Sequence, residues 1–227
     1  MNILLVGHGK MGRLVESLAG EYGCQISGIV DPTAGTDGVD SDRWRGAEVA
    51  IDFSSPDGVV ANVQALARRR IDIVLGTTGW AEHEAALRRT IADAGIGIVA
   101  APNFSTGVVL FESIVAHAAR LFAGQPEFGA FLHEAHHSAK KDAPSGTALK
   151  LARAMRDAGF VRPIDVSSTR AGSIPGTHTI GFDGPAETIT LTHTARDRSA
   201  FARGALTAAK WIRGKRGWFS MTDVLDL

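Results

Sequence analysis

Residues 2–15 read NILLVGHGKMGRLV, and this stretch decides the fold of the first half of the chain. The run NILLV predicts a buried strand, and Gly7, Gly9 and Gly12 then lead into a helical pattern. Between a strand and a helix, the spacing G-x-G-x-x-G is typical of a turn that places the pyrophosphate of a dinucleotide at a helix N-terminus. We therefore expect a dinucleotide site here. The alternative is a glycine-rich turn that binds no ligand.

The second expected strand, in QISGIVD, ends at Asp31, 19 residues after Gly12. A carboxylate at that place accepts hydrogen bonds from the adenosine ribose and repels a 2′-phosphate. The next residue is Pro32 rather than an arginine, so we expect NADH to be favoured over NADPH. Lys10 and Arg13 are near enough in sequence to leave NADPH use open. An ordinary strand-end turn residue is the alternative role for Asp31.

Outward from this motif, strand-like apolar runs alternate with helix-like stretches. The runs in EVAIDFS, DIVLGTT and IGIVAAPN are apolar enough for strands buried on both faces, as in a parallel sheet. Repeated strand–helix–strand units predict a doubly wound α/β domain of the Rossmann type. GTTGW (76–80) and APNFS (101–105) follow the later strands, where such sheets bind ligands. Loops that only cap the next helix through Thr78 and Ser105 are the alternative.

The pattern then changes. GVVLFESIVAHAARLFA (107–123) predicts a helix, and ETITLTHTA (187–195) alternates at period two, which predicts a strand with one buried face. Asp183-Gly184-Pro185 marks a turn before that strand. We expect a second α+β domain with a mixed or antiparallel sheet, and a final helix in FARGALTAAKWIRG (201–214). The expected buried stripe of the first helix is Val108, Phe111, Ile114, Val115, Ala118 and Phe122.

The composition bounds the function. The 227 residues hold 24 Lys plus Arg and 24 Asp plus Glu, which gives no support to a nucleic-acid or membrane-surface partner. No apolar run approaches the ~20 residues of a membrane span, and the N-terminus does not have the pattern of a signal peptide. One cysteine, Cys24, excludes an internal disulfide and a cysteine-rich zinc site. We expect a cytoplasmic protein.

The second informative stretch, HEAHHSAKKDAPSGTA (133–148), crowds titratable groups together. HEAHH formally matches the zinc-protease pattern H-E-x-x-H, but that pattern requires a helix, and the preceding EFGAFL favours a strand. On a strand, His133 and His137 lie ~13 Å apart, and Lys140 and Lys141 repel a cation. We therefore expect no metal. A solvated polar loop with satisfied histidines is a further alternative.

A site for an anionic substrate explains this stretch better. PSGTALKLARAMRDAG (144–159) predicts a helix, whose first residues 145–147 offer hydroxyls, backbone N–H groups and a dipole to a carboxylate. Lys140 adds a positive charge, and His136 and His137 titrate near neutrality. A hydride from a nicotinamide and a proton from His or Lys together reduce a C=C or C=N bond. The expected buried stripe of the helix is Ala148, Leu151, Ala152 and Met155.

The stretch EAHHSAKKDAPSGTA (134–148) closely resembles the signature E-x-H-H-x-x-K-x-D-x-P-S-G-T-A of the dihydrodipicolinate reductases. The likeness covers the whole chain: GHGKMGRLV, VAIDFSSPD, VLGTTGW, APNFSTGV, RAGSIPGTHTIGF and DRSAFARGAL occur in family order. The resemblance implies NADH- or NADPH-dependent reduction of 4-hydroxy-tetrahydrodipicolinate (dihydrodipicolinate) to tetrahydrodipicolinate, on the way to diaminopimelate and lysine. In that reaction the hydride goes to ring C4.

The resemblance also implies residue roles. It gives His136 as the proton donor and acceptor and Lys140 as a second proton donor. The implied substrate contacts are His137, Gly146 and Thr147, with Ser145 beside them. The implied cofactor contacts are Gly7, His8, Gly9, Lys10, Met11, Gly12, Asp31, Gly76, Thr77, Thr78, Ala101, Pro102, Asn103 and Phe104.

The resemblance further implies that residues 1–104 and 199–227 bind the dinucleotide. Residues 105–198 are then the substrate domain, which forms a homotetramer. Some family members carry Glu-Arg where this chain has Asp31-Pro32, which leaves NADPH use open. Two rival functions remain at this point: a Rossmann reductase of an acyclic acid, and a dinucleotide-sensing protein without turnover.

Overall fold

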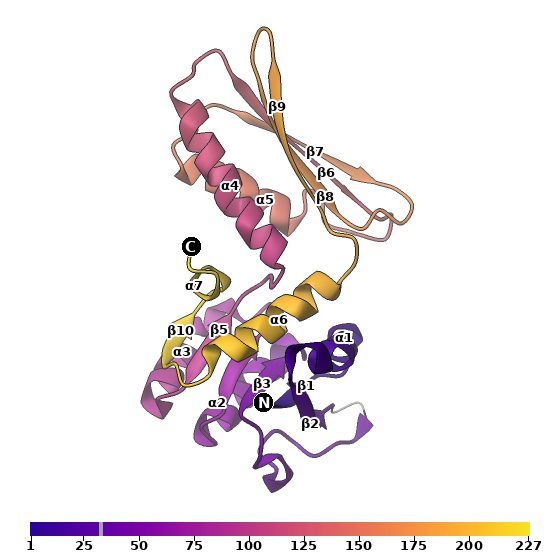
Figure 1. Ribbon diagram of the computed structural model, residues 1–227, viewed down its shortest axis with the longest axis vertical. Helices are drawn as coiled ribbons and strands as arrows, with labels where there is room; N and C mark the ends of the chain where they lie inside the picture. Colours follow the sequence, from indigo (N-terminus) through magenta and orange to yellow (C-terminus); the bar gives the residue numbers. More distant parts are fainter. Residues whose placement is uncertain (32–33) are drawn as a thin grey trace. The chain divides into compact units, whose positions relative to one another are not determined.

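The computed structural model describes residues 1–31 and 34–227, so Pro32 lies outside the described residues. The chain forms two compact units, coloured by sequence in Figure 1. Unit 1 consists of Met1–Thr106 and Arg198–Leu227, and unit 2 of Gly107–Asp197. Each unit has its own sheet and its own hydrophobic core.

Unit 1 is built on a six-stranded parallel sheet in the order β10-β5-β4-β3-β1-β2. Its strands are β1 (Asn2–Val6), β2 (Gln25–Val30), β3 (Val49–Asp52), β4 (Asp72–Leu75), β5 (Gly97–Ala100) and β10 (Gly217–Phe219). Its helices are α1 (Lys10–Ala19), α2 (Val59–Arg68), α3 (Glu84–Ala94), α6 (Ser199–Ile212) and α7 (Met221–Val224). α1 packs beside α6, and α2 beside α3. The expected Rossmann-type fold is confirmed.

A row of side chains across four strands shows why these segments form a parallel sheet. Leu4, Ala50, Ile73 and Ile98 are register neighbours on β1, β3, β4 and β5, and each is fully buried. Strands that are covered by helices on both faces require this near-continuous apolar sequence. The alternation of apolar runs with amphipathic helices therefore explains why these runs pair as the strands of a parallel sheet.

The C-terminal part of the chain returns to unit 1. α6 packs against β3, β4 and β5, and a Cβ on Gly204 would collide with the carbonyl oxygen of Phe104. This glycine lets the helix lie close to the chain that follows β5. The helix was predicted. The short strand β10, which pairs in parallel with β5 at the edge of the sheet, was not.

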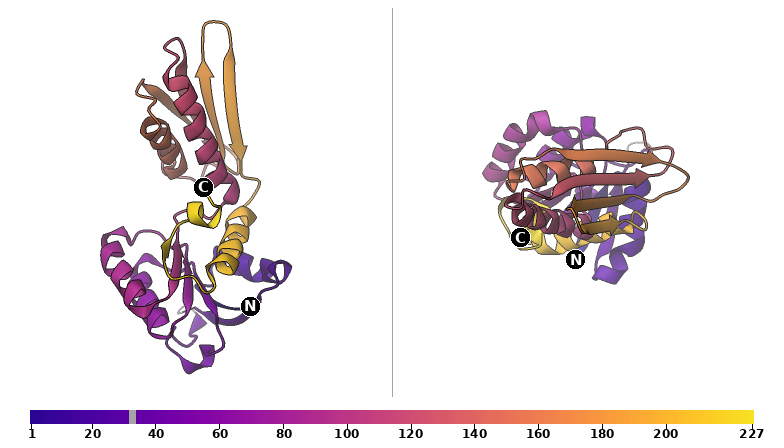
Figure 2. Two further views of the ribbon diagram at one scale, coloured as in Figure 1. Left: turned by 60° about the vertical axis from the view of Figure 1, so that its left-hand side comes forward. Right: turned by 90° about the horizontal axis from the view of Figure 1, so that it is seen from above.

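Unit 2 contains a four-stranded mixed sheet in the order β7-β6-β8-β9, with α4 and α5 on one of its faces (Figures 1 and 2). β6 and β7 are parallel, and the other pairs are antiparallel. Its elements are α4 (Thr106–Ala123), β6 (Gly129–His136), α5 (Gly146–Asp157), β7 (Ile164–Arg170), β8 (Thr177–Asp183) and β9 (Thr188–Thr194). The mixed sheet, both helices and the turn after Asp183 were predicted; β7 and β8 were missed.

The predicted buried stripe of α4 contains one error. Phe111 and Val115 are buried as expected, but Ile114 is 53% exposed and Ala119 takes a place in the core instead. The helix face that meets the sheet follows the i, i+4 row through Phe111, Val115 and Ala119, and Ile114 lies beside it. The stripe of α5 is confirmed, since Ala148, Leu151, Ala152 and Met155 are all buried.

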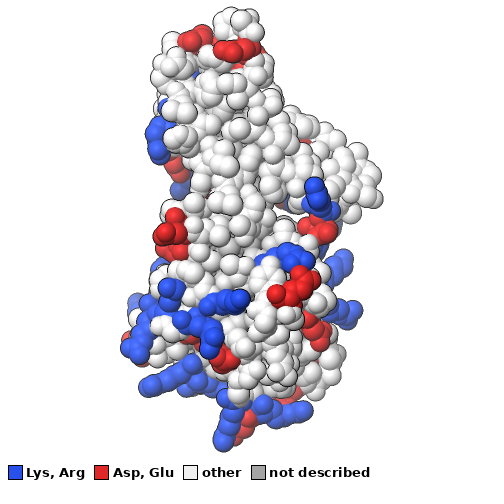
Figure 3. All heavy atoms as spheres, in the orientation of Figure 1, with Lys and Arg blue, Asp and Glu red and all other residues white. Residues whose placement is uncertain are grey.

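Helix α4 is also, among the described residues, the one helix long and apolar enough to cross a membrane by length and composition. Its buried residues Phe111, Val115 and Ala119 belong to the core of unit 2, so we assign it to that core. Figure 3 shows that the visible face over α4 carries few charged side chains, whereas Lys and Arg gather on the visible face of unit 1.

Candidate functional site

The glycine turn of unit 1 has the geometry that its sequence predicts. Gly7 has φ +89°, and a Cβ on it would lie 2.5 Å from the carbonyl oxygen of Phe53. A Cβ on Gly12 would collide with the carbonyl oxygen of Gly7. Gly9 faces open space and precedes α1, whose N-terminus no side chain of the described residues caps. The first backbone N–H groups of α1 are therefore left for an anion.

A cavity of about 460 Å³ opens at this turn. Asp31 and Arg13 both line it, as do the expected residues Gly7, His8 and Gly9. The His8 ring contacts the Glu16 carboxylate at 2.7 Å, and Arg13 Nε donates to the carbonyl oxygen of His8 at 3.2 Å. The remaining lining residues are Val6, Val30, Phe53, Ser54, Ser55, Gly58 and Asn62.

Asp52, which was not predicted as a site residue, holds the loops at this edge of the sheet. Asp52 is fully buried at the end of β3. It accepts hydrogen bonds from Ser54 N (2.9 Å), Ser54 Oγ (2.7 Å), Asn62 Nδ2 (3.0 Å) and Thr77 Oγ1 (2.8 Å). The signal for it was a lone acid that ends the apolar run VAID. Asp52 thus ties the loop after β3 to the loop after β4.

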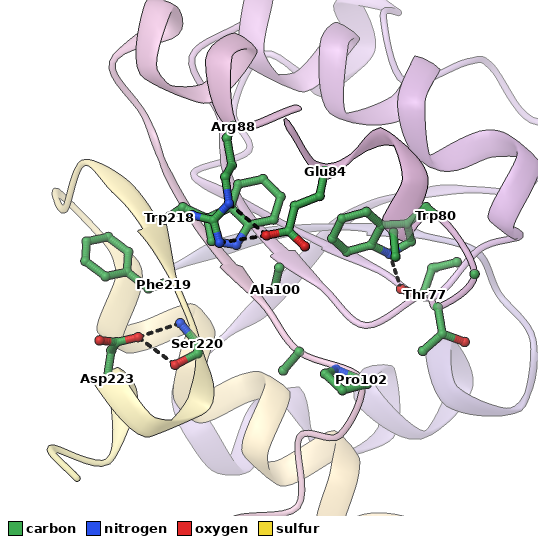
Figure 4. Close-up of a pocket in the computed structure, with 14 residues that line it drawn as sticks. Thr77, Trp80, Glu84, Arg88, Ala100, Pro102, Trp218, Phe219, Ser220 and Asp223 are labelled. Atoms are coloured by element: carbon green, nitrogen blue, oxygen red, sulfur yellow. Dashed lines mark hydrogen bonds and ion pairs between the residues drawn. The ribbon is translucent and has the colours of Figure 1, made fainter. Parts of the chain in front are cut away.

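Four of the seven residues expected after β4 and β5 line a second cavity in unit 1, of about 490 Å³, whereas Gly76, Asn103 and Phe104 do not. Thr77, Thr78, Ala101 and Pro102 all line it. The next helical turn begins at Ala81 with Trp80 as its N-cap, so the alternative of a Thr78 cap is wrong. Figure 4 shows the labelled residues that surround this space, including Thr77, Trp80, Ala100, Pro102 and Trp218.

Aromatic and charged groups form another part of this second cavity. The rings of Trp80 and Trp218 lie 5.8 Å apart, and the Arg88 guanidinium lies 4.7 Å above the Trp218 ring. Glu84 holds Arg88 at 2.7 Å (Figure 4). Phe104 is 2% exposed and its ring packs against Phe53 at 6.1 Å, so this ring is not available to a cofactor.

In unit 2, β6 divides its titratable residues between two faces of the sheet. Glu134 and His136 lie on the face covered by helices, whereas His133 lies on the other face, where its Nδ1 contacts Ser167 Oγ at 2.9 Å. Residues 133–136 form a strand, as expected, and not the helix that the zinc-protease pattern requires.

Glu134 is the centre of a polar network inside unit 2. Its side chain is fully buried and forms ion pairs with Arg170 and His136. Arg170 Nη2 donates to Oε1 at 2.6 Å and Nη1 donates to Oε2 at 3.0 Å. Burial by itself raises the pKa of Glu134, but hydrogen bonds from Arg170, Ser168 and His136 outweigh it and lower the pKa to about 2. Glu134 is therefore an anion at neutral pH.

Two histidines lie beside this anion. Their rings, His136 and His178, meet edge to face with centroids 5.2 Å apart. Burial lowers the pKa of His136, although Glu134 acts in the opposite direction. Burial, with the His136 charge next in size, lowers the pKa of His178 to about 4, so this ring is neutral at pH 7. Glu134, His136 and His178 have the donor atoms of a metal site, but the Arg170 guanidinium already occupies both oxygens of Glu134.

The start of α5 lies against this network. Ser145 is its N-cap, 2% exposed, with Oγ accepting from Ala148 N (3.1 Å) and bonded to His178 Nε2 (3.1 Å). Its N–H donates to Glu134 Oε1 at 3.3 Å. The hydroxyl of Ser145, an expected substrate contact, therefore fixes the helix and is not presented to solvent.

The other expected residues of this stretch are accessible. Gly146 is exposed, and His137, Lys140 and Thr147 are half-buried. Lys140 Nζ donates to both carboxylate oxygens of Asp142, at 2.8 and 3.0 Å. Unit 2 thus holds a histidine, a lysine and a helix N-terminus in one stretch, and these are groups that can donate a proton and bind an anion.

Comparison with protein families decides what this pair of units is. A model described as dihydrodipicolinate reductase, N-terminus, matches residues 1–104, and one described as dihydrodipicolinate reductase, C-terminus, matches residues 107–225. The chain belongs to the dihydrodipicolinate reductase family. Together the two models span nearly the whole chain, so the resemblance noted for the motifs holds for both units.

Relatives in this reductase family resemble the chain over most or all of its length. A 4-hydroxy-tetrahydrodipicolinate reductase of Christiangramia forsetii is 33% identical over 239 residues, covering 100% of this chain and 98% of that protein. One of Myxococcus xanthus is 41% identical over 198 residues, covering 79% of this chain and 72% of that protein. The family is one of nicotinamide-dependent oxidoreductases, which agrees with the glycine turn of unit 1.

Among solved structures, a dipicolinate-bound dihydrodipicolinate reductase of Paenisporosarcina sp. TG-14 has the same fold. Its TM-score is 0.83, with 98% of each chain covered and 20% sequence identity. At this identity the similarity shows the fold alone.

Proposed function

We propose that the chain catalyses the NAD(P)H-dependent reduction of 4-hydroxy-tetrahydrodipicolinate, the hydrated form of dihydrodipicolinate, to tetrahydrodipicolinate, in the pathway to diaminopimelate and lysine. The proposal rests on the family and on one observation of unit 2. His136 and Ser145, the N-cap of α5, both bond to the anionic Glu134, and Lys140 pairs with Asp142, whose carbonyl oxygen accepts from Arg170 of the same network. The hydroxy substrate, one hydride and one proton give tetrahydrodipicolinate and water.

Unit 1 fits the nicotinamide cofactor. The Cβ clashes at Gly7 and Gly12, with open space at Gly9, are those of a turn that admits a pyrophosphate. Gly7, His8, Gly9, Lys10, Met11 and Gly12 would hold the phosphates, and the residues after β4 and β5 the rest of the molecule. When bound, the cofactor supplies the hydride, to ring C4 of the substrate. Asp31, in the wall of the cavity, favours NADH because its carboxylate repels a 2′-phosphate.

Unit 2 suits the dicarboxylate. Lys140 already holds a carboxylate, that of Asp142, with bonds of 2.8 and 3.0 Å to its two oxygens. A substrate carboxylate can take that place, beside the exposed Gly146 and Thr147 at the start of α5. His137 is the fourth contact that we assign. The network behind α5 keeps this helix start in place while the ligand exchanges.

The proton comes from His136 and Lys140. Burial lowers the pKa of His136, so without substrate its ring is mainly neutral at pH 7. Two substrate carboxylates nearby favour the imidazolium form, because opposite charge raises a histidine pKa. The imidazolium then donates its proton as the hydride arrives, which is general acid catalysis. Lys140 both binds a carboxylate and is the second donor.

We also propose a cytoplasmic homotetramer. The face of the unit 2 sheet that α4 and α5 leave open carries a threonine ladder, with Thr177–Thr194 and Thr179–Thr192 hydroxyl pairs at 3.1 Å. Such a polar sheet face suits an interface between copies. Sedimentation equilibrium measures the mass directly, and a monomer at working concentration would contradict this part.

The decisive assay mixes the purified chain with NADH and the fresh condensation product of pyruvate and aspartate semialdehyde. We expect the nicotinamide absorbance to fall. His136→Ala should lower kcat about 100-fold, whereas His117→Ala, an exposed histidine of α4, should leave it unchanged. Turnover only with acyclic acids would instead support the acyclic-acid reductase, and NADH binding without any turnover would support a sensor.

A further inference from the structure

Glu134 is unusual among the acids of unit 2 because its side chain is fully buried and charged. A buried carboxylate is costly unless it is paired and hydrogen-bonded. Arg170 satisfies both oxygens at once in a two-pronged contact, at 2.6 and 3.0 Å. This geometry fixes the orientation of the carboxylate as well as its charge.

Arg170 is itself anchored at several points. It is the register neighbour of His136 on the adjacent parallel strand β7. Its guanidinium also donates to the carbonyl oxygens of Thr169 (2.8 Å) and Asp142 (2.5 Å). Arg170 therefore ties β6, β7 and the loop before α5 together, and Glu134 has little freedom to rotate.

The contact between Glu134 and His136 assigns the two ring nitrogens. Oε2 of Glu134 is bonded to Nδ1 of His136. An ionised carboxylate only accepts hydrogen bonds, so Nδ1 carries a hydrogen. In the neutral ring, Nε2 then has the lone pair, and in the charged ring Nε2 has the proton that can leave.

No side chain of residue 176 covers the Nε2 side of the His136 ring, because this residue is a glycine. Gly176 adopts φ +120°, and a Cβ on it would lie 3.2 Å from Nε2 and Cδ2 of His136. No hydrogen bond joins Nε2 to another residue in the described part of the chain, and the His136 side chain is 13% exposed. Nδ1 is thus committed to the interior, and Nε2 is left for an exchange with a ligand.

We propose that Glu134, fixed by Arg170, is a positioning residue of the reaction: it holds His136 with Nδ1 as donor and makes Nε2 the atom that exchanges the proton with the substrate. This inference rests on the proposed function and names the group that prepares its acid. Glu134 acts through His136 and does not itself contact the substrate.

The surroundings of His136 determine the sign of the expected pH effect. Glu134 is the neighbouring charge that raises the pKa of His136, whereas burial, Lys140 and Arg170 lower it. His178, on β8, is neutral above its pKa of about 4. Removing the Glu134 charge should therefore lower the pKa of His136. As the pH rises, the protonated, active form should then be lost at a lower pH than in the wild type.

The first experiment compares Glu134→Gln with the wild type over a range of pH. We expect kcat to fall about 100-fold and the pH at which activity is lost to move downward. Glu112→Gln is the matched control, because Glu112 is a carboxylate of the same unit that pairs with Lys150 instead. Glu134→Asp keeps the charge but withdraws the carboxylate, so it should lower kcat with a smaller change in the pH profile.

The second experiment distinguishes positioning from a purely structural role by a double-mutant cycle. If Glu134 acts through His136, then Glu134→Gln should have almost no further effect on kcat in a His136→Ala background. Equal fold losses in both backgrounds would overturn the proposal, because they would mean that Glu134 acts independently of the ring.

The third measurement needs no substrate and no change at Glu134. Nitrogen-15 NMR of the wild-type histidines reports which ring nitrogen carries hydrogen, and His136→Gln assigns the signal. We expect Nδ1–H in the neutral His136. A neutral ring protonated at Nε2 would overturn the proposal even if Glu134→Gln fails to fold. If the chain does not reduce the cyclic substrate, this measurement still decides the positioning claim separately from the function.

Discussion

The N-termini of α1 and α5 are both expected to receive an anion, but they are built in opposite ways. α1 follows a glycine N-cap, with no side-chain cap among the described residues. The shape of the turn before it comes from Gly7, Gly9 and Gly12, which lie within six positions of one another. α5 follows a buried serine, which is bonded to its own helix and to His178 on another strand. The N-terminus of α1 therefore has no side-chain cap among the described residues, whereas the N-terminus of α5 is hydrogen-bonded into a network.

The difference follows from what each ligand requires. A pyrophosphate needs close backbone approach and free N–H groups, and small residues provide both. A substrate that is also protonated needs charged groups held at defined positions, and these must come from several strands. The α1 site is therefore a local property of the chain, whereas the α5 site depends on tertiary packing.

The largest effect should come from Gly12→Ala. Its Cβ would collide with the carbonyl oxygen of Gly7, so α1 must move away from β1. We expect a stability loss of about 2 kcal/mol and loss of measurable NADH binding. Gly9→Ala is the control, because a Cβ there meets open space. Gly9→Ala should leave the urea midpoint unchanged and weaken only the binding of NADH, as fluorescence titration would show. Equal stability for both variants would contradict this account of α1.

The next largest effect should come from Lys140→Ala at the α5 start. Because this charge binds a carboxylate and donates a proton, kcat should fall about 100-fold and KM should rise. Lys141→Ala, the exposed neighbouring lysine, should behave like the wild type in the same steady-state assay. A rise in KM alone would show that Lys140 binds and does not protonate.

The network behind α5 predicts a pH dependence of stability. The pKa of His178 is about 4 in the folded chain, below its unfolded value of about 6.5. The unfolded chain therefore binds more protons between these values, and stability falls as the pH falls through this window. Between pH 7.5 and pH 5, we expect the free energy of unfolding to fall by about 2 kcal/mol less in His178→Gln than in the wild type.

Urea unfolding at the two pH values measures the His178 effect. His117→Gln, on the exposed side of α4, is the matched control and should leave the pH dependence as in the wild type. If His178→Gln lost as much stability on acidification as the wild type, the buried neutral ring would not be the cause.

The smallest effect should come from Asp31→Ser beside the glycine turn. Without this carboxylate, the ratio of NADH to NADPH affinity should fall about 10-fold, or about 1.4 kcal/mol. Asp93→Ser on α3 makes the same chemical change outside the cavity and serves as the control. Titration of both cofactors by fluorescence gives the ratio, and an unchanged ratio would exclude Asp31 from cofactor selection.

Some parts of the fold escaped prediction for a common reason. β7 and β8 lack the apolar density of a strand buried on both faces, and β10 has three residues, so only their partners define them. Ile114 was assigned to the core because an apolar residue next to a stripe cannot be told from one within it. In each case the deciding contacts are distant in sequence.

Sequence alone determined the Rossmann-type unit, the glycine turn and the stretch that holds His136, Lys140 and the start of α5, because each depends on residues close together in the chain. It also predicted a mixed sheet in the second unit, but two of the four strands of that sheet, β7 and β8, are defined only by their partners. Tertiary structure decided the roles of Asp52 and Glu134. A buried acid is defined by its partners, and Arg170 lies 36 residues from Glu134, on a neighbouring strand. Periodicity and motif spacing describe local geometry, whereas the partner of a buried charge is chosen only when the strands align.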